Sequence, residues 1–196
     1  MEHFLDHLAD TIAEQFHYTE EQRAVVRYGL VALLQTIVIF LLLVLLGLCF
    51  DFLPQALAVF FSVVLLRKQE GGAHASSLSG CLILTTLAVL SRYVFPLAGS
   101  WAALLLTVTL GAACVPVSWK LVPVESPNKP LRDSKKIARL RRNTFVLLTI
   151  YLFLAAVLAL PKEVLPFSSP SITFSSLSGT VWQTFTLTKP GRRFVN

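Results

Sequence analysis

Six long runs without a charged residue constrain this chain more than any other feature of its sequence. A soluble domain has roughly a quarter of its residues charged, whereas 14% are charged here, 55% are hydrophobic and the mean hydropathy is +0.68. Several runs reach the roughly 20 residues that a helix needs to cross a bilayer. The runs cover residues 28–50, 52–66, 78–91, 93–119, 143–160 and 164–188. We therefore predict an all-α, polytopic integral membrane protein with about six transmembrane helices, formed as a single membrane domain over residues 1–196.

The second and sixth runs are the weakest candidates for membrane spans. The run 52–66 is short and has Pro54 near its start, and the run 164–188 is rich in Ser and Thr. Proline and hydroxyl side chains are tolerated in membrane helices where neighbouring groups satisfy the backbone. A five-span chain without the last run is the alternative.

Basic residues fall almost entirely on one side of a six-span chain. If the N-terminus is cytoplasmic and the spans alternate, all of the 17 Lys and Arg residues except Arg92 and Lys162 are cytoplasmic. The positive-inside rule requires such a bias, and a five-span chain would move the three basic residues of the C-terminal segment outside. We therefore predict that both termini are cytoplasmic, together with the loops 67–77 and 120–142.

The first 22 residues have a pattern of their own. The segment is acidic, unlike a signal peptide, and its apolar residues follow helical spacing. These residues are Phe4, Leu5, Leu8, Ile12 and Phe16. We predict an amphipathic helix within residues 1–22, which either lies on the membrane surface or packs against the bundle.

The loop 67–77 contains His74, the only histidine after the first twenty residues, and Cys81 follows seven positions later. In one continuous helix these two residues would lie about 10 Å apart along the axis, which is too far for proton transfer. A catalytic pair therefore requires a helix that starts after His74. Ser76 or Ser77 could serve as the N-cap of that helix.

The remaining residues of this loop fit the same hypothesis. Gly71 and Gly72 allow the chain to turn back over the helix end. A helix N-terminus favours the thiolate form of Cys81, and Arg67 and Lys68 add positive charge. The pattern thus predicts a nucleophilic cysteine with His74 as its base.

Structural interpretations of the same residues stay open. A loop histidine is usually only solvated, a cysteine at a helix start is usually a small apolar residue, and Arg67 with Lys68 can act as a topology signal. His74 and Cys81 are two potential ligands without a third on the same side, so we expect no metal site. Cys49 and Cys114 are scattered and are expected to be apolar filler without a disulfide.

These residues resemble those of the accessory gene regulator B (AgrB) family, the membrane-embedded cysteine endopeptidases of peptide quorum sensing in Gram-positive bacteria. The matching pattern is Arg67-Lys-Gln-Glu-Gly71-Gly72-Ala-His74 followed by Cys81. A second similar stretch is Val122-Pro-Val-Glu-Ser-Pro-Asn-Lys129-Pro130, with basic residues after it. With the hydropathy profile and the length, the resemblance extends over essentially the whole chain.

The resemblance implies that Cys81 is the nucleophile and His74 its base, and that Arg67, Gly71, Gly72 and Lys129 are supporting or substrate-binding residues. No acidic or amide residue can be named from the sequence as the partner that orients His74. Glu70 is a possible partner, but it is very close to His74 in sequence. The implied reaction removes the C-terminal tail of a short precursor through a thioester. An internal Cys or Ser of the precursor then closes a thiolactone or lactone ring, which is the signal peptide.

The implied partners are an AgrD-like precursor peptide, membrane lipid and a second copy of the chain in a homodimer, without a cofactor. The implied location is the bacterial cell membrane, with the active-site loop in the cytoplasm. The basic run at residues 132–142 is the strongest topology signal, and it could also attract anionic lipid or an acidic tail. It contains no aromatic residue, which argues against nucleic-acid binding.

The alternative function is that of a non-enzymatic membrane protein, such as a small transporter or a channel subunit. Such proteins usually have ionisable groups within their spans or matching broken helices in two repeated halves. Here Asp51, Arg92 and Glu163 all lie near the ends of the runs, and the sequence has no internal repeat. The sequence therefore favours the enzyme.

Overall fold

The described part of the chain is helical throughout and contains no β-strand. The computed structural model describes residues 11, 15, 18–70, 77–94, 97, 100–124, 134–160, 164–165 and 169–195. The elements are α2 (Glu20–Cys49), α3 (Leu53–Glu70), α4 (Ser77–Val89), the π-helix η1 (Leu90–Val94), α5 (Ser100–Leu121), α6 (Ser134–Leu158), α7 (Pro170–Leu187) and α8 (Lys189–Val195). The all-α prediction is thus confirmed for these residues.

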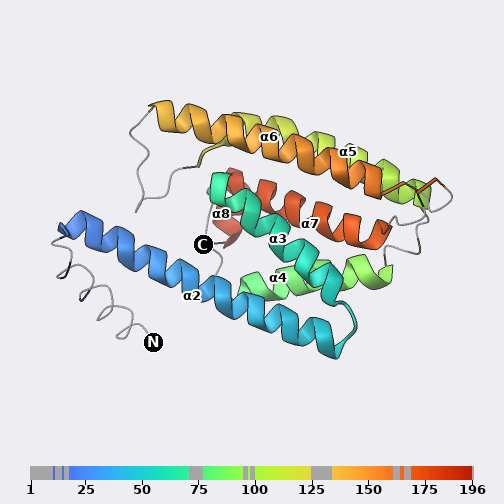
Figure 1. Cartoon of the computed structure of the whole chain (residues 1–196), viewed down its shortest axis with the longest axis horizontal. Coiled ribbons are helices and arrows are strands. Elements are labelled where there is room, and N and C mark those ends of the chain that lie inside the picture. Colours follow the sequence, from blue (N-terminus) through green and yellow to red (C-terminus); the bar gives the residue numbers. More distant parts are fainter. Residues whose placement is uncertain are drawn as a thin grey trace.

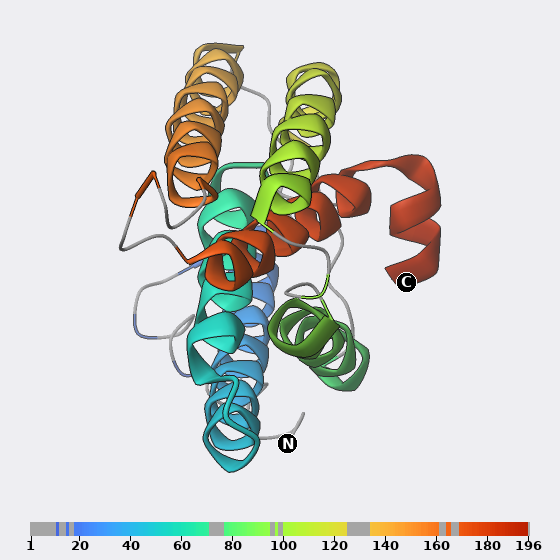
Figure 2. The ribbon, with the colours of Figure 1, turned by 90° about the vertical axis from the view of Figure 1, so that its right-hand side faces the viewer.

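The helices α2 to α7 run back and forth in three layers. Figure 1 shows α5 and α6 in one layer, α3 and α7 in the next, and α2 and α4 in the third, and Figure 2 shows the same order from the side. At one end of the bundle lie the starts of α2, α4 and α6 and the ends of α3, α5 and α7. We call it the basic end, because the described residues there include Arg23, Arg27, Arg67, Lys68, Lys120, Lys135, Arg139, Arg141, Arg142, Lys189, Arg192 and Arg193.

Three of the described helices are long and apolar enough to cross a membrane. These stretches are Gln22–Cys49 of α2, Leu104–Leu121 of α5 and Ile137–Leu158 of α6. The helices α3, α4 and α7 are shorter or more polar and do not meet that criterion. The structure therefore supports a membrane protein, whereas the total of six spans stays a prediction.

The Ser- and Thr-rich helix α7 occupies the middle of the bundle. It packs most extensively against α3 and also contacts α4, α5, α6 and α8. Several of its buried hydroxyls bond to carbonyls of their own helix, as in Ser175 to Ser171 at 2.8 Å and Thr180 to Ser176 at 3.1 Å. Because these hydroxyls are satisfied within the helix, α7 does not need the apolar surface of a lipid-facing helix.

Small residues let α7 and α3 approach closely. A Cβ atom on Gly179 would lie 2.8 Å from the carbonyl oxygen of Val59, closer than real Cβ contacts. At the far end of the same interface, Gln55 Nε2 donates to Ser171 Oγ at 3.1 Å. The two helices are thus parallel and in contact along most of their lengths.

The helix α2 lies at the periphery of the bundle. It begins at Glu20 after a capping box, in which Thr19 Oγ1 accepts from the Gln22 N–H while Gln22 Oε1 accepts from the Thr19 N–H. Little of its apolar stretch is fully buried within the protein, as expected of a helix that faces lipid on one side. The predicted amphipathic helix of residues 1–22 falls mostly outside the described residues and stays a prediction.

Candidate functional site

The structure describes two of the six predicted site residues, and for one of them only the backbone. Arg67 lies in the last turn of α3, and Cys81 lies in α4, whose described part begins at Ser77. His74, Gly71, Gly72 and Lys129 lie outside the described residues, as does the side chain of Cys81. The predicted pairing of His74 with Cys81 is therefore not tested.

The backbone of α4 gives the position of Cys81 along the helix. Cys81 follows Ser77, the first described residue of the helix, by four positions and so lies in the second turn. The positive end of a helix dipole acts mainly on groups in its first turns. The helix contacts α2 and α3, so that Cys81 belongs to the same end of the bundle as Arg67.

Arg67 is half-buried between α3 and α2. Burial lowers the pKa of its guanidinium, and the nearby Tyr28 of α2 raises that pKa. A guanidinium stays charged even so, because its unperturbed pKa is far above neutral. Arg67 is thus a positive charge held at the protein surface close to the chain that leads to His74.

Glu70 is the last residue of α3, and the sequence predicts no role for it in the site. Its side chain is fully buried, and it lies beyond the apolar part of the helix, residues 53–66. Burial raises the pKa of its carboxyl to about 7, while the facing side chains of Ser118 on α5 and Gln183 on α7 lower that pKa. Neither carboxylate oxygen has a hydrogen bond of normal geometry with any residue that the structure describes.

The spacing along α3 contains the signal for this burial. Val59, Val63, Leu66 and Glu70 recur every three or four positions, and all four are buried. This is the spacing of one helix face. The sequence predicts that a loop begins at residue 67. Instead α3 continues to Glu70, and the helical spacing places Glu70 on the buried face.

The two predicted cytoplasmic loops meet at their described ends. The backbone N–H of Val124 donates to the carbonyl of Glu70 at 2.9 Å. Arg141 of α6 donates through Nε to the carbonyl of Val122 at 3.0 Å. The end of α3 is thereby joined to the segment after α5 and, through it, to the first turns of α6.

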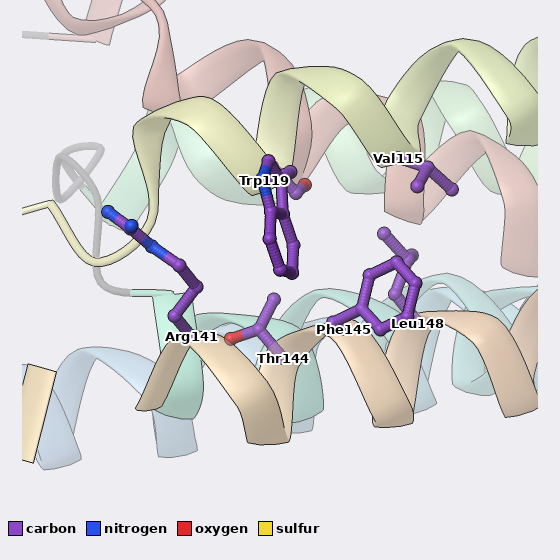
Figure 3. Close-up of a pocket in the computed structure, with 7 residues that line it drawn as sticks. Val115, Trp119, Arg141, Thr144, Phe145 and Leu148 are labelled. Carbon is purple, nitrogen blue, oxygen red and sulfur yellow. The ribbon is translucent and has the colours of Figure 1, made fainter. Parts of the chain in front are cut away.

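A small cavity lies between α5 and α6 beside this junction (Figure 3). In the figure, Val115 and Trp119 line it from α5, and Arg141, Thr144, Phe145 and Leu148 line it from α6. The volume of this cavity is about 10 Å³, which is room for about one water molecule. The hydroxyls of Ser118 and Thr144 lack a hydrogen-bond partner among the described residues, so this cavity suits a water and excludes a peptide.

A larger crevice of about 330 Å³ lies between α4, α5 and α7. Its lining is almost wholly apolar and includes Leu87, Leu110 and Trp182. None of the described residues that line it has a titratable side chain. Among the described residues there is also no group of three or more His, Cys, Asp or Glu side chains that could hold a metal ion.

The other two cysteines differ in their surroundings. Cys114 is buried, as expected of apolar filler, whereas Cys49 is exposed at the end of α2. Cys49 lies at the opposite end of the bundle from Arg67, next to the ion pair of Arg92 and Asp51. Neither residue belongs to the candidate site.

Comparison with known proteins gives one family and several relatives. The family model described as "Accessory gene regulator B" matches residues 5–187. The chain is 30% identical to "Putative AgrB-like protein 2" of Clostridium perfringens strain 13 and 27% identical to "Putative AgrB-like protein" of strain SM101, each match covering 94% of this chain and 89% of the relative. It is 24% identical to a "Putative AgrB-like protein" of Halalkalibacterium halodurans, over 79% of both chains. No solved structure matches.

Proposed function

Because the chain belongs to the accessory gene regulator B family, we propose that it is a membrane cysteine endopeptidase that trims and cyclises a short signal-peptide precursor. Family membership supports a role in the processing of quorum-sensing peptides, and the apolar helices α2, α5 and α6 support a membrane protein. The observation that carries the proposal is the family match over residues 5–187. Within that match, Cys81 lies early in α4 and Arg67 in the last turn of α3.

In the first step His74 takes the proton of the Cys81 thiol, and the thiolate attacks the carbonyl carbon before the C-terminal tail of the precursor. The carbon–nitrogen bond breaks, and the imidazolium of His74 gives its proton to the leaving amine. The rest of the precursor is then held on Cys81 as a thioester. Backbone N–H groups at the start of α4 are suited to stabilise the oxyanion that forms in this step.

In the second step an internal Cys or Ser of the precursor attacks the thioester carbonyl, and His74 accepts the proton of that thiol or hydroxyl. The bond to the Cys81 sulfur breaks, the thiolate regains the proton from His74, and a thiolactone or lactone is released. No water is consumed. Exchange of one thioester for another changes the free energy little, so a site that keeps water out favours ring closure over hydrolysis.

Arg67, Gly71, Gly72 and Lys129 support this chemistry in the proposal. Arg67 provides a positive charge close to the site, and the two glycines allow the chain to turn between α3 and α4. Lys129 belongs to the segment that leaves the junction at Val124. An acidic precursor tail would be attracted to both basic side chains.

We further propose that the basic end faces the cytoplasm and that the enzyme acts as a homodimer in the bacterial cell membrane. The clustering of the described basic residues at this end supports the orientation. The precursor, an AgrD-like peptide, would reach the site along the lipid surface by means of an amphipathic leader. Anionic lipid would also bind the basic run at residues 132–142.

Reconstitution tests the proposed reaction directly. The purified protein in lipid vesicles is incubated with a candidate precursor, a peptide of about 40 to 60 residues with an amphipathic start and an acidic end that is sought beside its gene; this length allows for a surface helix. Mass spectrometry follows the free tail and the cyclic product. We expect both from the wild type and from Cys49→Ala, the matched control, and neither from Cys81→Ala. Equal processing by Cys81→Ala would refute the proposal.

A further inference from the structure

The proposed mechanism leaves the buried carboxyl of Glu70 without a role. This residue ends α3, and the chain passes from it through residues 71–76 to α4. Its side chain is fully buried. A buried carboxyl is costly to keep unless its environment supports it, so its position calls for an explanation.

Glu70 is held by groups from three other parts of the fold. Its side chain faces Ser118 of α5 and Gln183 of α7, and its carbonyl accepts the hydrogen bond of 2.9 Å from Val124. The segment of Val124 is in turn fixed by Arg141 of α6. The last residue of α3 is therefore tied to α5, to α7 and, through the segment 122–124, to α6.

Polar side chains from two other helices face the carboxyl. The Glu70 oxygens and Ser118 Oγ are buried without a hydrogen bond of normal geometry among the described residues. Ser118 and Gln183 can each donate to the carboxyl oxygens, which is why they lower its pKa, while burial favours its neutral form. A shift of α3 along its axis would break this set of contacts at once.

We propose that Glu70 is a positioning residue of the peptidase, whose side chain locks the end of α3 between α5 and α7 and so fixes where Arg67 and the segment carrying His74 start. This inference rests on the proposed function. His74 follows Glu70 by four positions, and four residues span at most about 14 Å. If the Glu70 side chain is displaced, His74 is therefore displaced too. A misplacement of a reacting group by about 1 Å can lower the rate about a hundredfold.

The test compares Glu70→Ala with two other variants in the reconstituted, full-length protein. Glu70→Gln keeps the shape and the hydrogen-bonding capacity of the side chain. Gln55→Ala is the matched control, because it removes a buried polar contact between the same two helices, α3 and α7, at their other end. For each variant kcat, KM and the melting temperature are measured.

Positioning predicts a larger loss in kcat than in binding. Glu70→Ala should lower kcat about tenfold or more and raise KM by a clearly smaller factor, since the reacting groups are misplaced while Arg67 only attracts the precursor tail. Glu70→Gln should keep at least about a third of the activity, and Gln55→Ala should lose only stability. Equal kcat losses in Glu70→Ala and Gln55→Ala, or a loss in Glu70→Gln as large as in Glu70→Ala, would overturn the inference.

A second readout separates this inference from the proposed reaction. The rate of alkylation of Cys81 by iodoacetamide, followed by peptide mass spectrometry, needs no precursor. It should change at least about fivefold in Glu70→Ala and less than about twofold in Gln55→Ala, because the thiolate depends on the placement of its base. If the wild type processes no precursor, the proposed function fails, but the alkylation rate of Cys81 still tests the positioning role of Glu70. Unchanged alkylation in Glu70→Ala overturns the positioning role.

Discussion

The backbone N–H of Val124 donates a 2.9 Å hydrogen bond to the carbonyl of Glu70. These residues belong to segments 54 positions apart, each of which leads directly into one of the two motifs that resemble the accessory gene regulator B family. The bond joins the end of α3, before His74, to the start of the stretch that contains Lys129. The described parts of the two motifs, residues 67–70 and 122–124, therefore meet at the basic end.

The buried carboxyl of Glu70 predicts that stability falls as the pH rises toward neutrality. Burial raises the pKa of this carboxyl to about 7 in the folded protein, against 4.5 for a free glutamic acid side chain, so the folded state binds the proton more tightly. The stability that depends on the protonated Glu70 carboxyl is fully present below about pH 4.5. As the pH rises through about 7 this stability is lost, and the free energy of unfolding falls by up to about 3 kcal/mol. The groups that act on this carboxyl include Ser118 and Gln183, while Cys114 of α5 and Arg67 of α3 lie nearby.

Thermal unfolding of the detergent-solubilised protein at pH 5 and pH 8 measures this dependence. The wild type should melt roughly 5 °C or more lower at pH 8. Glu70→Gln cannot ionise, so the difference between the two pH values should become much smaller. An equal difference in both proteins would show that other groups cause the pH dependence.

Gly179 is expected to be indispensable to the packing of α7 on α3. Its substitution by Ala would bring the Cβ atom within 2.8 Å of the Val59 carbonyl oxygen, a backbone atom that cannot move aside easily. We expect Gly179→Ala to cost about 1–3 kcal/mol, typical of overpacking. Gly29→Ala is the control, because nothing lies within 4 Å of its added Cβ, and it should be neutral or stabilising. Equal melting temperatures for the two variants would contradict the packing described for α7.

The ion pair at the end opposite the basic end should matter little. Arg92 donates to Asp51 Oδ2 at 3.0 Å, and both side chains are exposed. Exposed pairs contribute about 0–1 kcal/mol. We expect Arg92→Ala to keep precursor processing within about twofold of the wild type. A large loss of activity with unchanged stability would place functional chemistry at this end instead.

The orientation in the membrane can be tested with Cys49. This residue is exposed at the end of α2, and the proposed topology places it outside the cytoplasm. In intact cells a membrane-impermeant maleimide should label Cys49 in a Cys81→Ser, Cys114→Ser background. A cysteine introduced at Arg193 should react only after the cells are opened. The reverse pattern would invert the proposed topology.

The sequence was sufficient to predict an all-α membrane protein and the clustering of basic residues, because bilayer thickness and charge act on local stretches of chain. It could not reveal that the polar run 164–188 forms the central helix. Thr173, Ser175 and Thr180 look unfavourable in a membrane until their bonds to carbonyls of their own helix are known. Packing between distant segments decides such cases.

Glu70 illustrates the same limit at the candidate site. Its neighbours Ser118 and Gln183 are 48 and 113 positions away, so no local pattern reveals that they face it. Its spacing from Val63 and Leu66 would have placed it on the buried face of α3 if the helix had been continued past residue 66. The pairing of His74 with Cys81 remains a prediction from the motif.

The most direct test of the central claim is the intact mass of the protein after a brief incubation with its precursor and an acid quench. The account predicts a wild-type adduct equal to the precursor without its tail, which hydroxylamine removes because it is a thioester on Cys81. Cys49→Ala should form the same adduct and Cys81→Ala should form none. An adduct that persists in Cys81→Ala, or cleavage of the precursor by that variant, would contradict the account.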